Sequence, residues 1–177
     1  MKNILLASFV VLFAMAAQAQ QKLVPADAGS KVQFVIRNFG INTNGQISGL
    51  KGQVIFDKNK LTKSSFDITA EVSTLNTDNK KRDHHLQAAD YFDVERFPLM
   101  HITGKPVLVK GNAYILKGNL TIKDVTKAIE IPFTVTPQQN KILFSGAFKI
   151  NRLQYHVGES SAILADDVKI TFQVLAQ

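Results

Sequence analysis

The chain contains no cysteine, and this absence excludes several kinds of chemistry at once. Without a thiol there is no disulfide, no cysteine nucleophile, no cysteine-based metal site and no acylated cysteine to tether the mature protein to a membrane. The sequence also lacks a phosphate-binding loop, a dinucleotide-binding G-x-G-x-x-G motif and a nucleophile elbow, G-x-S-x-G. The sequence therefore contains no motif of these kinds that would indicate nucleotide binding or nucleophilic catalysis.

The chain begins with the features of a secretory signal rather than with a membrane span. Residues 1–3 are a short basic start, residues 4–17 are apolar, and Ala17-Gln18-Ala19 is a small-residue cleavage site. The apolar run is shorter than the roughly 20 residues of a transmembrane helix. We therefore expect residues 1–19 to be a signal peptide and residues 20–177 to form one domain. An exported chain without cysteine is typical of the periplasm.

Acidic residues are fewer than basic ones, with 14 Asp and Glu against 21 Lys and Arg and a formal net charge of +7. This excess favours transient contact with an anionic membrane surface. The lysines are nevertheless dispersed over expected strands and turns, as in an ordinary solvated surface. No basic stripe is interleaved with aromatic residues, so we expect no nucleic-acid partner.

Most of the chain after the signal alternates apolar and polar residues with a period of two, which is typical of strands with one buried face. The alternating segments are residues 32–36, 54–56, 66–72, 114–122, 129–135, 142–150 and 168–174. Turn signals separate them, among them Asn44-Gly45, Gly111-Asn112 and Asp166-Asp167. So many antiparallel strands in one domain close into a barrel or stack as a sandwich, and we expect an all-β barrel of about eight strands.

Residues 78–97 carry the helix signals of the chain, with Asp78 as the expected N-cap. One helical face would hold, at i, i+3, i+4 and i+7, Arg82, His85, Leu86 and Ala89. A polar pair on an apolar helical face beside a sheet predicts a short helical insertion that covers one end of the barrel.

A barrel of about eight strands either fills itself with side chains or holds one small ligand, and composition leaves both open. The helical cover favours a cavity. Candidate lining residues, assigned from strand parity, are Phe34, Ile36, Phe56, Ile68, Val72, Phe133, Phe144, Phe148 and Phe172. Candidate residues of the mouth are Asn38, Arg82, His85, Leu86 and Phe92. We expect Arg82 either to meet an anionic or carbonyl head group or to brace the helix on backbone carbonyls.

The histidines do not form a metal-binding pattern. His84 and His85 are neighbours and would point about 100° apart on a helix, and no H-x-x-x-H pair exists. We expect no metal and no cofactor. Arg82, Asp83 and His85 together resemble a general acid/base cluster, so a hydrolase or isomerase that uses Asp83 and His85 on a lipid-like substrate is an alternative.

Several segments, in the same order along the chain, resemble the motifs of one known family. They are Ser30–Ile36 followed by Asn38-Phe39-Gly40; Arg82–Leu86, matching R-D-x-H-L; Tyr91–Val94 with Phe97-Pro98; Gly118–Ile122 with Val125–Lys127; and Ile150–Arg152 with Gly158. The chain thereby resembles the YceI-like family of exported, lipocalin-like, polyisoprenoid-binding proteins. It departs from the family at Asn38, where a histidine is common, and at Lys123-Asp124, where His-Gly is common.

The resemblance implies a lipocalin-like antiparallel barrel with a long apolar tunnel and relatives that often form dimers. It also implies a ligand such as a polyprenyl compound, a quinone-like isoprenoid or a fatty-acid derivative. We therefore predict a periplasmic binding or carrier protein for a long-chain amphiphilic lipid, not an enzyme, with a homodimer as one expected state. A ligand-free stress or assembly factor with a packed barrel is the other alternative.

Overall fold

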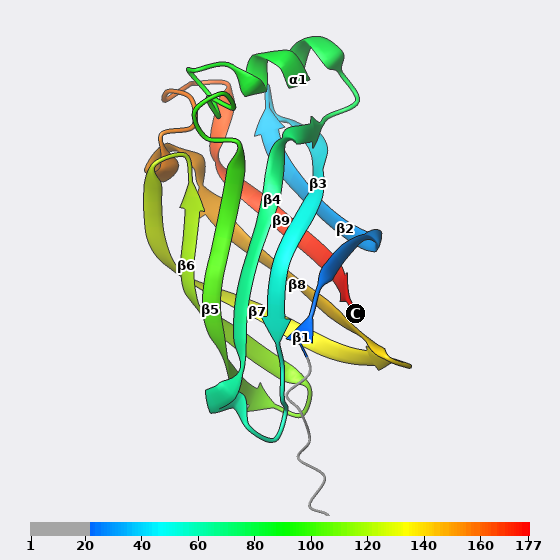
Figure 1. Cartoon of the computed structure of the whole chain (residues 1–177). Coiled ribbons are helices and arrows are strands. Elements are labelled where there is room, and N and C mark those ends of the chain that lie inside the picture. Colours follow the sequence, from blue (N-terminus) through cyan, green and yellow to red (C-terminus); the bar gives the residue numbers. More distant parts are fainter. Residues whose placement is uncertain (1–21) are drawn as a thin grey trace, which may run out of the picture.

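Eight antiparallel strands close into a barrel with one α-helix at its end, in a computed structural model that describes residues 22–177 (Figure 1). The predicted signal peptide, residues 1–19, lies outside the described residues. The strands of the barrel are β2 (Pro25–Asn38), β3 (Ile41–Ile55), β4 (Ser65–Asn76), β5 (Leu99–Lys110), β6 (Ala113–Ile122), β7 (Val125–Gln138), β8 (Lys141–Asn151) and β9 (Leu164–Ala176). The remaining elements are β1 (Lys22–Leu23), η1 (Leu61–Lys63), α1 (Lys80–Gln87) and η2 (Arg152–Tyr155).

Each strand pairs with the next one along the chain, from β2 to β9, and β9 pairs back with β2. This up-and-down order closes the barrel, and the main open edge is the first part of β7, where the β7–β8 pairing has not yet begun. The short β1 pairs with the end of β3 through Lys22 and Ile55. The predicted all-β, lipocalin-like barrel of about eight strands is confirmed.

The alternation in the sequence produces this sheet directly. In β7 the side chains of Ile131, Phe133 and Val135 are buried, and the residues between them are exposed. Pro132 points outward at the place where β7 stops pairing with β8, since the first β7–β8 pair is Phe133 with Gly146. A proline is tolerated there because its missing N–H is not needed by a neighbouring strand.

Two predicted turns are wrong. Asn44-Gly45 lies inside β3, and Asp166-Asp167 lies inside β9. The β2–β3 turn is instead Phe39-Gly40, whose φ angles of 49° and 73° are both left-handed, as a two-residue hairpin requires. At Asn44-Gly45 the β2–β3 pairing continues through the turn signal. At Asp166-Asp167 the β2–β9 pairing is irregular between Ile36 and Asn38, so this signal marks a bulge within a strand and not a turn.

The helix is shorter than predicted, because α1 spans Lys80–Gln87 and residues 88–97 form turns. Asp78 is not its N-cap. Asn79 caps the helix, and its side chain accepts a hydrogen bond from the backbone N–H of Arg82 at 3.0 Å. Asp78 is held in a left-handed conformation, φ 58°, by the Asn76 side chain, which accepts from its N–H at 2.8 Å. Ala89 therefore falls beyond the helix and is exposed.

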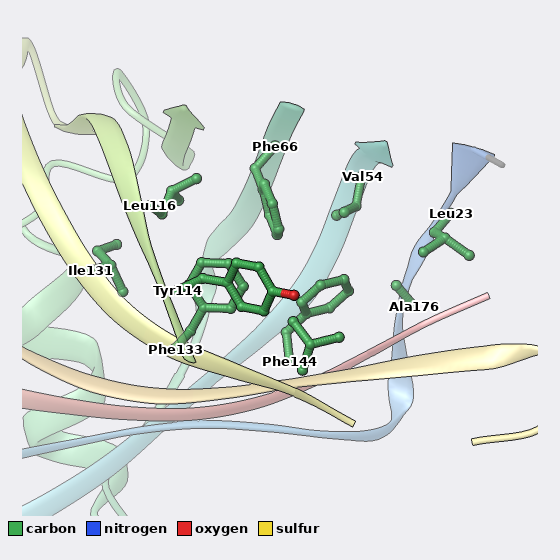
Figure 2. Close-up of a cluster of buried hydrophobic side chains, with 10 residues drawn as sticks. Leu23, Val54, Phe66, Tyr114, Leu116, Ile131, Phe133, Phe144 and Ala176 are labelled. Carbon is green, nitrogen blue, oxygen red and sulfur yellow. The ribbon is translucent and has the colours of Figure 1, made fainter. Parts of the chain in front are cut away.

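A cluster of buried aromatic and aliphatic side chains closes the end of the barrel opposite α1. The rings of Phe66, Tyr114, Phe133 and Phe144 come from four strands and point toward one another (Figure 2). Phe66 meets Phe133 and Phe144 edge-on, with ring centroids 5.5 and 5.2 Å apart. Edge-to-face packing of this kind stabilises the cluster beyond its buried area, so it forms a rigid floor.

Within residues 22–177, no helix combines the length and the apolar character that crossing a bilayer would take.

Candidate functional site

The barrel is hollow between this aromatic floor and the helical cover. A cavity of about 380 Å³ is bounded at one end by floor residues such as Phe66 and Phe144 and at the other by α1 and the turns after it. Its walls are mostly aliphatic and aromatic side chains from the barrel strands. A volume of this size lies in the usual range for small-molecule sites.

Most of the candidate residues line this cavity. From the strands they are Phe34, Ile36, Asn38, Ile68, Phe133, Phe144, Phe148 and Phe172, and from α1 and its following turns they are Arg82, His85, Leu86 and Phe92. His85 lines the cavity while 61% of its side chain is exposed, so the cavity reaches the surface beside α1.

Phe56 and Val72 do not line the cavity. Phe56 packs into the floor, with ring centroids 5.3 Å from Tyr114 and 5.6 Å from Phe144. Val72 is 2% exposed, and its backbone N–H donates to the carbonyl of Pro98 rather than to a barrel strand. Strand alternation predicted that Val72 would line the cavity. The β4–β5 pairing ends at Glu71, however, and the segment before β5 lies beside Val72 instead.

Many phenylalanines point into the barrel without filling it, because the rings of two of them lie along the barrel wall. A Cβ added to Gly45 would stand 2.2 Å from the Phe34 ring, and one added to Gly146 would stand 2.7 Å from the Phe172 ring. In both pairs the glycine is the direct cross-strand partner of the phenylalanine. Each ring therefore occupies the space of the missing side chain instead of the lumen.

Arg82 braces the cover and faces the cavity at the same time. Its Nε donates to Thr77 Oγ1 and its Nη2 donates to the Thr77 carbonyl, each at 2.7 Å. No hydrogen bond within residues 22–177 uses its Nη1. One nitrogen of a guanidinium that borders an apolar cavity is thus left to bind an acceptor.

The residues of the enzymatic alternative are not brought together. Asp83 Oδ1 accepts hydrogen bonds from the backbone N–H of Thr77, at 2.8 Å, and from its hydroxyl. His85 Nε2 lies 3.2 Å from Asp90 Oδ2, and its ring packs edge-on against Tyr91. The Asp83 carboxylate thus joins α1 to Thr77, the residue that follows β4, and Asp90 rather than Asp83 is the partner of His85. In the part of the chain described, no three His, Asp or Glu side chains cluster as metal ligands.

Parity did not identify Arg152, a cavity-lining residue that is 4% exposed. Its guanidinium donates to the carbonyls of Ala165, Val157 and Glu159 at 3.0, 2.9 and 2.8 Å, and it pairs with Asp166 at 3.2 Å. The charge is thereby compensated, and the loop between η2 and β9 is held against the barrel. The Ile150-Asn151-Arg152 motif was the available signal.

Tyr155, the last residue of η2, is a second lining residue that strand alternation did not identify. It is 3% exposed, and burial raises the pKa of its phenol above the ordinary value of 10.0. Along the upper part of β7, where β8 does not pair, η2 packs against β7. Tyr155 and Ile150 line both the cavity and the outer groove there, so they form the barrel wall at this point.

The model of one protein family, described as the YceI-like domain, matches residues 23–176. A curated relative, the UPF0312 protein plu2095 of Photorhabdus laumondii subsp. laumondii, is 29% identical over 99 residues, which cover 55% of this chain and 52% of the relative. The chain therefore spans about half the length of that relative.

Solved structures share the fold. BcnA of Burkholderia cenocepacia is 28% identical, with a TM-score of 0.82 over 86% of this chain and 99% of its own. A polyisoprenoid binding domain from Saccharophagus degradans, implicated in plant cell wall breakdown, has a TM-score of 0.70 and 12% identity, over 88% of this chain and 97% of its own. The second likeness concerns the fold alone.

Proposed function

The chain belongs to the YceI-like domain family, and from this membership we propose that it is a periplasmic binding or carrier protein for a long-chain isoprenoid or other amphiphilic lipid. The observation that carries the proposal is the hollow apolar barrel, closed by aromatic rings at one end and bordered by polar side chains at the other. The Saccharophagus degradans domain that shares the fold is a polyisoprenoid binding domain, which supports the same class of ligand.

Apolar burial supplies the affinity in this proposal. Each buried methylene contributes roughly 0.8 kcal/mol, so about ten of them contribute roughly 8 kcal/mol. Association costs on the order of 4–15 kcal/mol in lost freedom of motion. A long chain thus offsets this cost, whereas a short one does not.

The polar groups at the mouth would orient the ligand. Arg82 offers its unused Nη1 to an anionic or carbonyl head group, and Asn38 lies on the lining of the same cavity. The mechanism is binding without turnover. The Asp83 carboxylate is held by Thr77, which supports a structural role for that residue rather than a catalytic one.

Export belongs to the same proposal. Residues 1–19 would direct the chain out of the cytoplasm, and residues 20–177 would form the mature lipid-binding domain. Cell fractionation followed by mass measurement of the mature protein tests both, with cleavage after Ala19 as the expected result.

Native mass spectrometry of the protein purified from its own host tests the function. We expect a bound amphiphile that organic extraction releases, and the same spectrum gives the number of subunits. A variant that fills the lumen, Ala70→Phe, should lose this ligand, because Ala70 lines the cavity. Its matched control is Ala128→Phe, which changes an exposed alanine of β7 and should retain the ligand.

A host-purified protein that carries no extractable amphiphile, and that also fails to bind farnesol and palmitic acid in titrations, would overturn the carrier proposal.

A further inference from the structure

The most exposed large apolar side chains of residues 22–177 lie at the barrel mouth. Ile41 is 72% exposed and Phe39 is 70% exposed; Phe39 lies in the turn between β2 and β3, and Ile41 is the first residue of β3. The tip of β2 and the helix α1 lie at the same end of the barrel (Figure 1). Isolated exposed apolar residues are ordinary, but a contiguous set beside a cavity marks an interaction site.

A third exposed side chain completes this set. Ile163 is 46% exposed, and its carbonyl accepts a hydrogen bond from the Phe39 N–H at 2.8 Å. We call Phe39, Ile41 and Ile163 the mouth rim. Their chain neighbours Asn38 and Leu164 are cross-strand partners, and both line the cavity. The mouth rim is therefore continuous with the lipid site.

The turn holds Phe39 in an unfavourable conformation. Its φ is 49°, and that of Gly40 is 73°. Two-residue hairpin turns of this kind favour asparagine or aspartate before the glycine, because a bulky side chain is strained at positive φ. The Arg37 guanidinium donates to the Gly40 carbonyl at 3.2 Å and supports the turn. A strained aromatic ring aimed at solvent is a feature of functional sites rather than of folding.

We propose that the mouth rim inserts into the apolar layer of a phospholipid bilayer, so that the lipid moves between bilayer and barrel without crossing water. This role rests on the proposed lipid-binding function. An aromatic ring among aliphatic side chains with an arginine beside it suits the bilayer interface, where aromatic residues and snorkelling arginines collect. A second copy of the chain is a poorer fit, because a stable dimer buries about 800 Å² per partner and three side chains offer less.

The opposite end of the barrel offers a contrasting surface. Val107 and Val109 are 45% and 60% exposed, between Lys105 and Lys110, and β5 packs there against η1. Lysines attract anionic lipid, but docking through this end would leave the cavity mouth pointing away from the bilayer. These valines therefore supply matched controls.

The absence of tryptophan makes the test direct, because one introduced indole is the sole indole fluorophore. Phe39→Trp and Val109→Trp proteins are mixed with vesicles of phosphatidylcholine and phosphatidylglycerol in equal parts, some with brominated acyl chains. We expect the Phe39→Trp emission to shift to the blue and to be quenched by bromine, also at high salt. The Val109→Trp emission should do neither. A response from Val109→Trp alone, or from neither protein, overturns the proposal.

Transfer of lipid gives the second readout. The probe is a dansyl-labelled fatty acid, offered either in the same vesicles or as a cyclodextrin complex. The double variant Phe39→Ser/Ile41→Ser should extract it from vesicles at least about tenfold more slowly than the unmodified protein. Uptake from cyclodextrin should be unchanged, and Val107→Ser/Val109→Ser should extract normally.

Different results would disprove lipid binding by the barrel and membrane insertion of the mouth rim. If the unmodified protein takes up no probe from cyclodextrin, the lipid-binding function is wrong. If uptake from cyclodextrin is normal and the Phe39→Ser/Ile41→Ser protein extracts from vesicles at the unmodified rate, membrane insertion of the mouth rim is wrong.

Discussion

The ring of Phe34 in β2 lies across the backbone of Gly45 in β3, at a place where an added Cβ would stand 2.2 Å from the ring. The three nearest atoms to that Cβ all belong to the Phe34 ring, and none to the backbone. This contact leaves the ring against the wall and the lumen open. The size of the cavity therefore depends on a residue that has no side chain.

The substitution Gly45→Ala should displace the Phe34 ring into the cavity. The ring has empty space to enter, so the free energy of unfolding should fall by only about 1 kcal/mol, at the low end of overpacking costs. Palmitic acid binding should weaken far more than binding of a shorter fatty acid, because the lumen becomes shorter or narrower. Paired calorimetric titrations with the two acids measure the difference.

The control is the double variant Gly45→Ala/Phe34→Leu, in which a smaller side chain makes room for the methyl group. It should recover palmitic acid binding. If Gly45→Ala binds both acids as tightly as the unmodified protein, the wall position of the Phe34 ring does not set the cavity size.

These glycine contacts explain why the barrel could be predicted from the sequence and its hollowness could not. Alternation along β7 is a local property, because the apolar or polar character of each residue predicts whether its side chain is buried or exposed. That Phe34 meets Gly45, and Phe172 meets Gly146, depends on which residues pair across strands. Register arises from the closed sheet as a whole, so the sequence left a packed and a hollow barrel open.

The Arg82 side chain should contribute a charge to binding beyond its brace on Thr77. Replacing Arg82 by Met should weaken binding of farnesyl diphosphate by about tenfold or more, because a hydrogen bond to a charged group contributes roughly 1.5–3 kcal/mol. Farnesol, which carries no charge, should bind within about twofold of the unmodified protein. Competition against a fluorescent lipid measures both ligands.

The matched variant is Thr77→Val, which removes the hydroxyl that Arg82 and Asp83 share and keeps the guanidinium. Both variants should lose about 1–3 kcal/mol of stability, because both loosen the joint between β4 and α1. Equal losses of farnesyl diphosphate affinity in the two would mean that Arg82 acts through the brace alone.

The sequence placed Arg82 at the mouth but left its partner open, and the same holds for the helix cap. Asp78 and Asn79 are adjacent, and both residue types cap helices well. Asn79 takes the position because the Asn76 side chain binds the Asp78 N–H and holds Asp78 outside the helix. Capping propensity alone therefore does not distinguish Asp78 from Asn79, and the hydrogen bond from the Asp78 N–H to the Asn76 side chain decides between them.

The buried Arg152 should be among the residues that stabilise the fold most strongly. Arg152→Met removes the guanidinium that donates to the carbonyls of Ala165, Val157 and Glu159. It also removes the ion-pair partner of Asp166. We expect the free energy of unfolding to fall by about 3 kcal/mol or more, because each buried carbonyl left without a donor costs roughly 1–3 kcal/mol, whereas the half-exposed Asp166 adds little. Urea denaturation measures the change.

Arg96→Met is the control for this loss. Arg96 pairs with Asp93 at 3.3 Å and lies over the Phe97 ring, but 74% of its side chain is exposed. Solvent screens such a pair, so the change should cost about 0–1 kcal/mol. A comparable loss in both variants would contradict the role assigned to the buried network of Arg152.

The buried phenol of Tyr155 should make the fold sensitive to alkaline pH. Burial raises the pKa of Tyr155 in the folded protein above 10.0, its ordinary value. Above about pH 10 the unfolded chain therefore loses this proton before the folded protein does. Unfolding then releases a proton, and stability falls as the pH rises toward the folded-state pKa, by at most about 1.4 kcal/mol per pH unit.

The substitution Tyr155→Phe removes this titration while keeping the ring that fills the wall beside β7. The difference in unfolding free energy between the two proteins should be constant below about pH 9 and should shift in favour of the Phe variant above pH 10. Urea denaturation across this range measures it. A difference that stays flat to pH 11 would show that the phenol ionises equally well in both states, and that Tyr155 does not seal the barrel wall.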